Sequence, residues 1–201
     1  MWQKAMNWLH VVVLFVILNF LWITGTIVGL IVFGATPSTI AILKLIELPR
    51  IFENSYGYGE LIFRYIHNYR EAFKNNKVFL FAPVLTEIIA FFELLMISQY
   101  DLLQAIFQIP MIVLMVYSLF IVFHVSYLAT QMDRLTFKNY KLVLLSPFIF
   151  KRSTVLGLIS LIALVVITIF KNWMCLVLFS LVIYIAYRMI SHDYESHGWL
   201  K

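Results

Sequence analysis

Residues 9–33 read LHVVVLFVILNFLWITGTIVGLIVF and contain no Asp, Glu, Lys or Arg. A helix needs about 20 apolar residues to cross a bilayer core of about 30 Å, so this run can span a membrane with some tilt. The apolar core of a cleaved secretory signal has only about 7–15 residues. We therefore expect residues 9–33 to form an uncleaved membrane span.

The composition of the whole chain agrees with a membrane protein. Of its 201 residues, 63% are hydrophobic and 12% are charged, whereas a soluble domain has about 45–50% apolar and about 25% charged residues. A soluble domain of this size leaves about 30% of its unfolded-chain surface in water, and this chain has too few polar residues to cover such a surface. We therefore expect lipid to surround most of it.

Four more apolar runs follow the first, and together they predict an all-α membrane protein with five spans. The expected spans are residues 9–33, 78–98, 103–130, 154–170 and 173–190. We expect the whole chain, residues 1–201, to form a single membrane domain.

Two segments outside these runs predict helices at the cytoplasmic membrane interface. Residues 37–48 follow a Thr-Pro pair at residues 36–37 that is typical of a helix start, and they are too short to span. An interfacial and a re-entrant position both fit this segment, with Lys44 and Glu47 reaching lipid headgroups. Residues 60–76 carry apolar side chains at helical spacing and charged side chains on the other face, as surface-lying amphipathic helices do.

The distribution of Lys and Arg predicts the orientation of the five spans. Thirteen of the 15 basic residues fall on one side of the membrane when the connecting segments alternate between sides. Cytoplasmic loops are enriched in Lys and Arg, so we expect the N-terminus outside and the C-terminus inside. Trp8 would then lie at the outer interface and Tyr184 near the inner one. The net charge of +5 follows from this bias and does not indicate nucleic-acid binding.

Two similar segments lie where the chain is expected to enter the membrane from the cytoplasm. Residues 70–83 read REAFKNNKVFLFAP, and residues 134–147 read RLTFKNYKLVLLSP. The similarity has two possible explanations. Basic and aromatic residues with a proline suit any inner membrane boundary, so the two segments can be alike by convergence. They can also be copies in a parallel repeat of two-helix units. A repeat would let both boundaries dock equivalent features of a partner. The candidate docking residues are Arg70, Phe73, Lys74, Lys77, Arg134, Phe137, Lys138 and Lys141, and the expected helix kinks lie at Pro83 and Pro147.

Glu87 and His124 are ionisable residues inside expected spans, where such residues are costly and often functional. Counted from the cytoplasmic ends of their spans at about 1.5 Å per residue, Glu87 lies about 15 Å deep and His124 about 10 Å deep. A Glu–His pair at similar depth can move protons or bind a cationic group. A polar clamp that only joins two helices is the other interpretation.

Gly25, Gly29 and Gly34 are spaced by four and five residues, which predicts a face where another helix packs closely. The sequence contains no glycine-rich phosphate loop, nucleophile elbow or zinc-binding spacing, and Cys175 is its only cysteine. We therefore expect no enzymatic activity, no cofactor and no metal site.

Three stretches carry a family resemblance. The run GATPSTIAILKL at residues 34–45, YREAFKNNK at 69–77 and FKNYKLVLLSP at 137–147 resemble the YesL-like family of bacterial integral membrane proteins. That family is described as a domain of unknown function, and the resemblance extends over nearly the whole chain, including the five-span plan. No catalytic residue follows from it.

Members of this family are often encoded beside carbohydrate ABC importers and glycan-degrading enzymes of Gram-positive bacteria. The resemblance therefore implies an accessory membrane subunit of a sugar ABC importer in the bacterial plasma membrane. Two other interpretations stay open: a small self-associating transporter that uses Glu87 and His124, and a cell-envelope factor. We expect the partners to be the lipid bilayer and other membrane subunits, or a second copy of the chain, and not nucleic acid.

Overall fold

The computed structural model describes residues 2–31, 33–53, 55–75, 77–132 and 135–197, and every regular element among them is helical. The predicted all-α fold class is therefore confirmed. In chain order the elements are α1 (Trp2–Val28), α2 (Ala35–Ile46), the 3₁₀ helix η1 (Ile51–Glu53), α3 (Tyr58–Asn75), α4 (Lys77–Ile97), α5 (Asp101–Gln131), α6 (Phe137–Ile149), α7 (Lys151–Phe170), the 3₁₀ helix η2 (Asn172–Leu176) and α8 (Leu178–Ser196).

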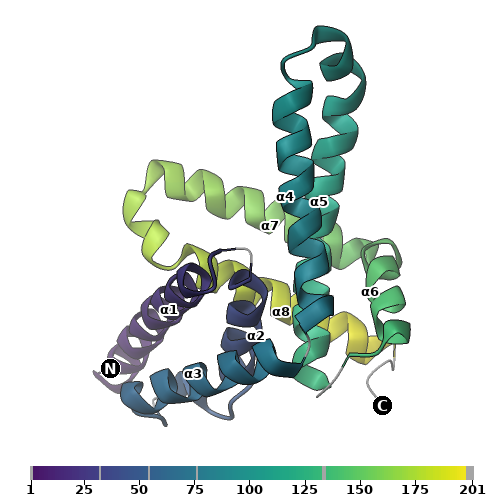
Figure 1. Ribbon diagram of the computed structural model, residues 1–201. Helices are drawn as coiled ribbons and strands as arrows, with labels where there is room; N and C mark the ends of the chain where they lie inside the picture. Colours follow the sequence, from purple (N-terminus) through teal and green to yellow (C-terminus); the bar gives the residue numbers. More distant parts are fainter. Residues whose placement is uncertain (1, 32, 54, 76, 133–134, 198–201) are drawn as a thin grey trace.

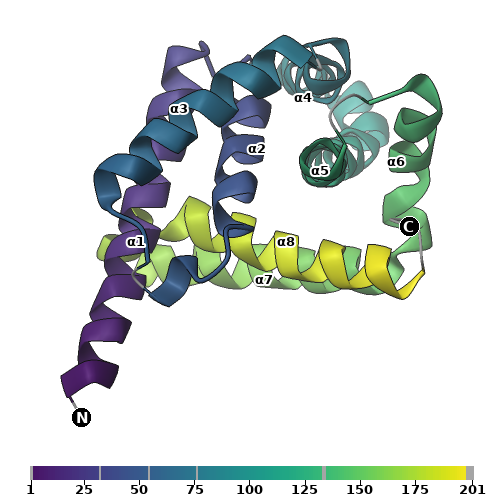
Figure 2. The same ribbon diagram turned by 90° about the horizontal axis from the view of Figure 1, so that it is seen from below.

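Helix α2 lies at the centre of the fold, between α1 and α5 in Figure 2, and it also contacts α3 and α8. Ten of its 12 residues are buried, because a helix that is apolar on all sides needs a partner on every side. This burial does not place α2 relative to a membrane, so the interfacial and re-entrant positions expected for residues 37–48 both stay predictions. The helix begins at Ala35 after Gly34, rather than at Pro37.

Helix α3 covers one side of α2. The amphipathic pattern predicted for residues 60–76 forms this helix, and the side chains that it buries include Leu61 and Tyr65. The neighbouring apolar stripe of Ile62 and Ile66 stays exposed. Helix α3 therefore has one apolar face in contact with the protein and a second one that points outward.

Helices α4 and α5 form an antiparallel hairpin that projects away from the other helices (Figure 1). Ser118 in α5 donates a hydrogen bond of 2.8 Å to the Pro83 carbonyl in α4, and this bond defines the register of the pair. The hairpin is apolar on its outer surface as well as at its internal contact. Its exposed large apolar residues include Leu85, Ile89, Phe92, Leu102, Ile106 and Ile109.

Helices α7 and α8 form a second pair, which runs across the base of the α4–α5 hairpin (Figures 1 and 2). The predicted span at residues 173–190 is not one continuous helix. The 3₁₀ helix η2 occupies Asn172–Leu176, and α8 begins at Leu178 and continues to Ser196. The local apolar pattern does not distinguish a helix from this tight turn, because both are apolar in sequence.

Three helices among the described residues are long and apolar enough to cross a membrane: Met6–Val28, Asp101–Gln131 and Lys151–Phe170. Helix α5 stands upright in Figure 1 where α7 runs across it, and α1 crosses α7 in Figure 2. The structure thus has helices of membrane-spanning length and composition, and it does not confirm the five-span topology.

Candidate functional site

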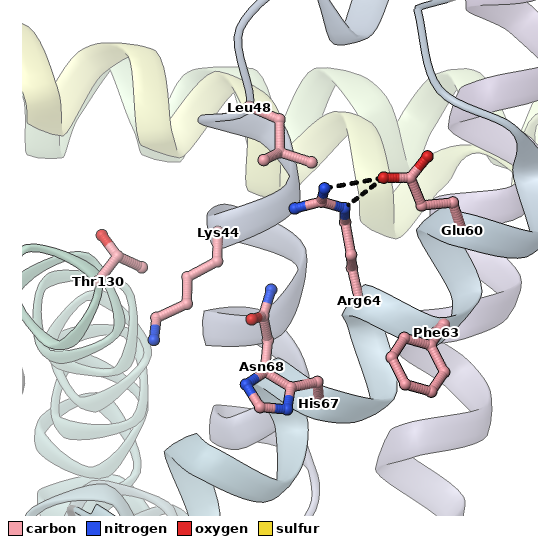
Figure 3. Close-up of a pocket in the computed structure, with 8 residues that line it drawn as sticks. All are labelled: Lys44, Leu48, Glu60, Phe63, Arg64, His67, Asn68 and Thr130. Atoms are coloured by element: carbon pink, nitrogen blue, oxygen red, sulfur yellow. Dashed lines mark hydrogen bonds and ion pairs between the residues drawn. The ribbon is translucent and has the colours of Figure 1, made fainter.

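An open cleft of about 620 Å³ lies between α2 and α3, next to the end of α5 (Figure 3). Its size is within the usual range of small-molecule sites, about 300–1,000 Å³. Most of its lining side chains are polar or charged, and they come from α2, α3 and α5 and from Leu48 just after α2. The lining residues are Lys44, Leu48, Glu60, Phe63, Arg64, His67, Asn68 and Thr130.

Helix α3 supplies most of the cleft because of its residue spacing. Glu60, Arg64 and His67 recur at intervals of four and three, so they share one face of the helix, while Tyr65 beside them is buried against the α2 side. Nη2 and Nε of Arg64 lie 2.8 and 2.9 Å from Oε1 of Glu60. The guanidinium also lies over the Tyr56 ring, 5.5 Å from its centroid. These contacts hold Arg64 in place at the edge of the cleft.

Charged residues of α2 pair with the neighbouring helices. Nζ of Lys44 lies 2.9 Å from Oε2 of Glu71, which joins α2 to α3, and this hydrogen bond lowers the pKa of Glu71. Oε1 of Glu47 accepts hydrogen bonds of 3.1 and 2.6 Å from Thr130 and Gln131 of α5, and burial raises the pKa of Glu47. Lys44 and Glu47 therefore both have partners within the protein, and their expected contact with lipid headgroups stays a prediction.

Sequence reasoning missed the cleft, because it assigned Arg64 and His67 to the outward face of a surface helix. A signal was present in α2. Lys44 and Glu47 are charges in an otherwise apolar segment of about a dozen residues, and a charge in such a helix is rarely buried without a partner. That pattern predicts an internal partner for each charge, although it does not identify Glu71 or Thr130.

The structure does not bring Glu87 and His124 together. From the level of the Ser118–Pro83 hydrogen bond, Glu87 lies four residues toward the tip of the hairpin and His124 six residues toward its base. At about 1.5 Å per residue the two side chains are about 15 Å apart along the helices. Among the described residues, Oε2 of Glu87 and Nδ1 of His124 each lack a hydrogen-bond partner. The expected depth of each residue is counted from the cytoplasmic end of its own helix, which assumes that both helices end at the same level. In the structure α5 extends beyond α4 at the base, so Glu87 and His124 lie at different depths.

His124 lies in an aromatic core at the base of the hairpin. Its side chain is 1% exposed. The imidazole stacks on the Phe150 ring at 6.1 Å between centroids and lies 5.9 Å from the Tyr194 ring of α8. A cavity of about 20 Å³ next to it is lined in part by Ser153 of α7. His124 is therefore part of an aromatic core between helices, and Glu87 takes no part in this contact.

The basic residues of the two expected docking boundaries lie on the surface. Arg70 and Lys74 are exposed on α3, and Lys138 and Lys141 are exposed on α6. Phe137 is exposed as well, with Nζ of Lys141 over its ring at 5.3 Å. The side chain of Lys77 and the whole of Arg134 lie outside the described residues.

The two similar segments have different local structures. Residues 70–83 end α3 and begin α4, and Phe73 in this segment is half-buried against the Phe81 ring. Residues 134–147 instead lead into α6, with Thr136 as the N-cap, and the helix continues past the end of the segment. Residues 76 and 134 lie outside the described residues, so a repeat and convergence both stay open.

Both expected kink prolines lie inside helices, Pro83 in α4 and Pro147 in α6. A proline lacks an N–H and leaves the carbonyl four residues earlier without its helical partner. For Pro147 that carbonyl belongs to Val143, and Oγ of Ser146 donates a hydrogen bond of 2.6 Å to it. The carbonyl of Pro83 accepts from Ser118. Pro83 thus contributes its carbonyl to the contact between α4 and α5, whereas the carbonyl that Pro147 leaves free is satisfied within α6.

The three glycines pack against parts of their own chain. A Cβ on Gly25 would clash with the Tyr65 hydroxyl, and one on Gly29 would clash with the Gly34 backbone. The Tyr69 hydroxyl donates a hydrogen bond of 3.0 Å to the Gly25 carbonyl. The face predicted for close packing therefore contacts α3 and the turn after α1.

A second cleft, of about 460 Å³, is lined by both Trp8 and Tyr184. The Phe15 ring of α1 lies 5.6 Å from Tyr184, whereas Asn19, further along α1, meets the backbone N–H of Phe179, earlier in α8. The two helices therefore run in opposite senses where they touch. The expectation that Trp8 and Tyr184 lie at opposite membrane interfaces is wrong in this structure, because an outside N-terminus with five spans gives the first and last spans the same direction.

Comparison with known proteins finds one related family. A family model described as "Protein of unknown function, DUF624" matches residues 15–94, which extend from α1 into α4. The expected similarity to a family of unknown function is confirmed over these residues, which make up less than half of the chain. Neither a curated protein nor a solved structure matches the chain.

Proposed function

We propose that this protein is a non-enzymatic integral membrane protein that acts by associating with other membrane proteins, as an accessory subunit of a bacterial carbohydrate ABC importer. The observation that carries the proposal is the outward-facing apolar surface of α5 and α7. In the most apolar stretch of α5 only 17% of the residues are buried, and in that of α7 only 6% are buried. The largest apolar patch on a typical soluble monomer is about 300–600 Å², so helices of this length exposed on most sides need lipid or another protein.

Helix α7 illustrates the argument. Its polar residues are few. Opposite the side at Gly157, Leu161 and Leu164 that faces α5 and α8, large apolar residues are exposed on a wide face. They include Val155, Leu156, Ile159, Ile162, Val165, Val166, Ile169 and Phe170. A helix that is apolar all round is buried in a protein core or in a membrane, and α7 has no such core around it among the described residues.

Extraction of native membranes with alkaline carbonate tests the location. An integral protein stays in the membrane pellet after carbonate treatment and is released by detergent. We expect this behaviour for the full chain. Release by carbonate alone would contradict the proposal.

Cysteine labelling tests the span that we propose for α5, with the hairpin tip outside and the start of α6 inside. Cys175 is the only cysteine, so a Cys175→Ser background accepts single new cysteines. With a membrane-impermeant maleimide on intact cells, we expect Gln99→Cys at the hairpin tip to react and Thr136→Cys to react only after lysis. Labelling of both from outside would contradict the span assigned to α5.

The family resemblance supports a sugar importer as the larger complex, and the exposed basic residues of α6 are the proposed contact. Capture of the tagged protein from native membranes in mild detergent should enrich importer subunits. We expect Lys138→Glu with Lys141→Glu to reduce this enrichment several-fold, and the exposed control Arg50→Glu to leave it unchanged. A stable monomer without enriched importer subunits would contradict the proposal.

The transporter interpretation loses its geometric basis, because it relied on a contact between Glu87 and His124. We expect Glu87→Gln to leave any solute flux into proteoliposomes at the wild-type rate. A flux that this substitution abolishes would restore the transporter interpretation.

A further inference from the structure

We propose that the cleft between α2 and α3 binds the phosphodiester group of a phospholipid headgroup. Lys44 and Arg64 enter the cleft from two different helices, and Asn68 lies between them with His67 beside it (Figure 3). This inference rests on the proposed membrane location, and it assigns a ligand to a site that the proposed association does not use.

The cleft has more hydrogen-bond donors than its own acceptors occupy. A lysine ammonium has three N–H donors and a guanidinium has five. Lys44 uses one of them on Glu71, and Arg64 uses two on Glu60. Asn68 makes no hydrogen bond with another described residue, which leaves its amide donors available. A phosphate group presents several acceptor oxygens in a small volume and therefore matches this set.

The carboxylates around the cleft limit the charge of the ligand. Glu60 and Glu71 each balance one cation of the cleft, and Glu47 adds a third carboxylate near Thr130. Arg70 and Lys74 lie further along α3 and form no ion pair with a described residue. Two cations thus face three carboxylates, so the cleft would hold a singly charged phosphodiester through its free hydrogen-bond donors and not through net charge attraction. A phosphomonoester, with a charge of about −1.5 to −2 at pH 7, would be repelled more strongly by the carboxylates.

Apolar residues at the rim favour a lipid over free phosphate. Leu48 and Phe63 line the cleft, and Phe63 is 73% exposed. Ile62 and Ile66 continue this exposed apolar stripe along α3. Apolar and basic residues side by side on one helix are typical of helices that lie at a membrane surface. The stripe thus provides contacts for the glycerol and first acyl carbons of a bound lipid.

Native mass spectrometry of the full-length protein in detergent measures lipid binding directly. The probes are phosphatidylglycerol, a diacylglycerol with the same acyl chains, and inorganic phosphate. We expect the protein to retain phosphatidylglycerol and to bind diacylglycerol about tenfold more weakly, since a hydrogen bond to a charged group contributes about one order of magnitude in affinity. Inorganic phosphate at equal concentration should not displace phosphatidylglycerol.

Three variants test the cleft itself. Arg64→Gln should weaken phosphatidylglycerol binding about tenfold and Asn68→Ala about threefold. The matched control Arg70→Gln removes a cation from the same helix outside the cleft, and should change binding less than about twofold. Thermal unfolding of each variant verifies that the fold is intact. Because Arg64 is half-exposed, we expect its substitution to leave the fold intact.

Three outcomes would overturn the inference: equal loss of binding in Arg64→Gln and Arg70→Gln, equal binding of diacylglycerol, or displacement by inorganic phosphate. If any of these results is obtained with a protein that stays in the membrane after carbonate treatment, the lipid site is contradicted and the membrane location is not. A carbonate-released protein that binds phosphatidylglycerol through Arg64 supports the site and contradicts the location.

Discussion

The hydroxyl of Tyr65 fills the space that a side chain at residue 25 would occupy, so Gly25 and Tyr65 hold α1 and α3 in close contact. Oγ of Ser38 lies 2.7 Å from this hydroxyl and donates its own proton to the Trp22 carbonyl at 2.9 Å. The Tyr65 hydroxyl must therefore be the donor to Ser38. Burial raises the pKa of Tyr65 to about 12, which keeps that proton in place at neutral pH. Three helices thus meet at one glycine.

Gly25→Ala should destabilise the protein by about 1–3 kcal/mol, because its Cβ overlaps the Tyr65 hydroxyl and forces a shift of packed helices. Tyr65→Phe removes the hydroxyl and should cost about 1 kcal/mol for the lost hydrogen bond. In the double variant the new Cβ meets the ring carbon Cζ at 3.1 Å, which a small shift relieves. The double variant should therefore be less destabilised than the sum of the two single variants.

Thermal unfolding in detergent measures this double-mutant cycle. A favourable coupling above about 0.5 kcal/mol is expected, which exceeds the usual deviation from additivity of distant sites. Strictly additive effects would show that the hydroxyl does not block residue 25.

Glu71→Gln should flatten the dependence of stability on acid pH. Lys44 holds the pKa of Glu71 below its usual 4.5, so the folded state favours the ionised form. The resulting stabilisation is present above pH 4.5 and is lost as the pH falls through the lower pKa of the folded state. Because the side chains of Lys44 and Glu71 are 25% and 38% exposed, we expect a loss of only about 0.5–1 kcal/mol at pH 7. Unfolding measured from pH 7 down to acid pH gives the profile.

Glu47→Gln provides the matched comparison, because it should act with the opposite sign. Burial raises the pKa of Glu47, so its ionised form is disfavoured in the folded state and costs stability above the usual pKa. A glutamine carbonyl still accepts from Thr130 and carries no charge. We expect Glu47→Gln to be neutral or slightly stabilising at pH 7. Equal losses in both variants would contradict the assigned pKa directions.

His124→Phe should leave stability unchanged or raise it by up to about 1 kcal/mol. A phenyl ring keeps the stacking on Phe150 and removes Nδ1, a buried polar atom without a hydrogen-bond partner among the described residues. His124→Ala should cost about 2–4 kcal/mol, because it leaves a cavity in the core. Denaturation of both variants in the same detergent tests whether His124 acts by packing alone. An equally large loss in His124→Phe would show that the imidazole has a polar function.

Asn19→Leu should destabilise the contact between α1 and α8 by about 2–4 kcal/mol. The Asn19 side chain is 2% exposed. Its Nδ2 donates to the Cys175 carbonyl at 3.1 Å, and its Oδ1 accepts from the N–H groups of Phe179 and Ser180 at 3.0 and 3.3 Å. Leucine has a similar size and leaves these three backbone groups unpaired. The control Thr24→Val on the same helix, which removes an exposed hydroxyl, should change stability by less than about 0.5 kcal/mol.

Several helices could be predicted from local sequence signals with small errors. Residues 78–98 and 103–130 were expected as spans and form Lys77–Ile97 and Asp101–Gln131. A long apolar run interrupted by polar residues such as Asp101 is a signal contained within one segment, so neighbours in space are not needed to recognise it. The failure at residues 173–177 has the same origin, since nothing local separates the 3₁₀ turn from the helix after it.

The candidate cleft could not be predicted in this way. Lys44 and Glu71 are 27 residues apart, and Glu47 and Thr130 are 83 residues apart. Such pairs depend on how helices pack, and helical periodicity describes only one helix at a time. The sequence predicted headgroup contacts for Lys44 and Glu47, because it did not reveal their partners on α3 and α5.

The amino-acid sequence by itself determined that the chain is helical, where most helices lie, and that several of them are too apolar for water. These properties follow from residue composition and spacing, because the hydrophobic effect depends on apolar area and not on which neighbour covers it. Only the tertiary structure decided that α2 is central, that Glu87 and His124 are apart, and that Lys44 and Arg64 line one cleft. Those relationships require hydrogen bonds and side-chain packing, which are directional and hold only at one register of the helices.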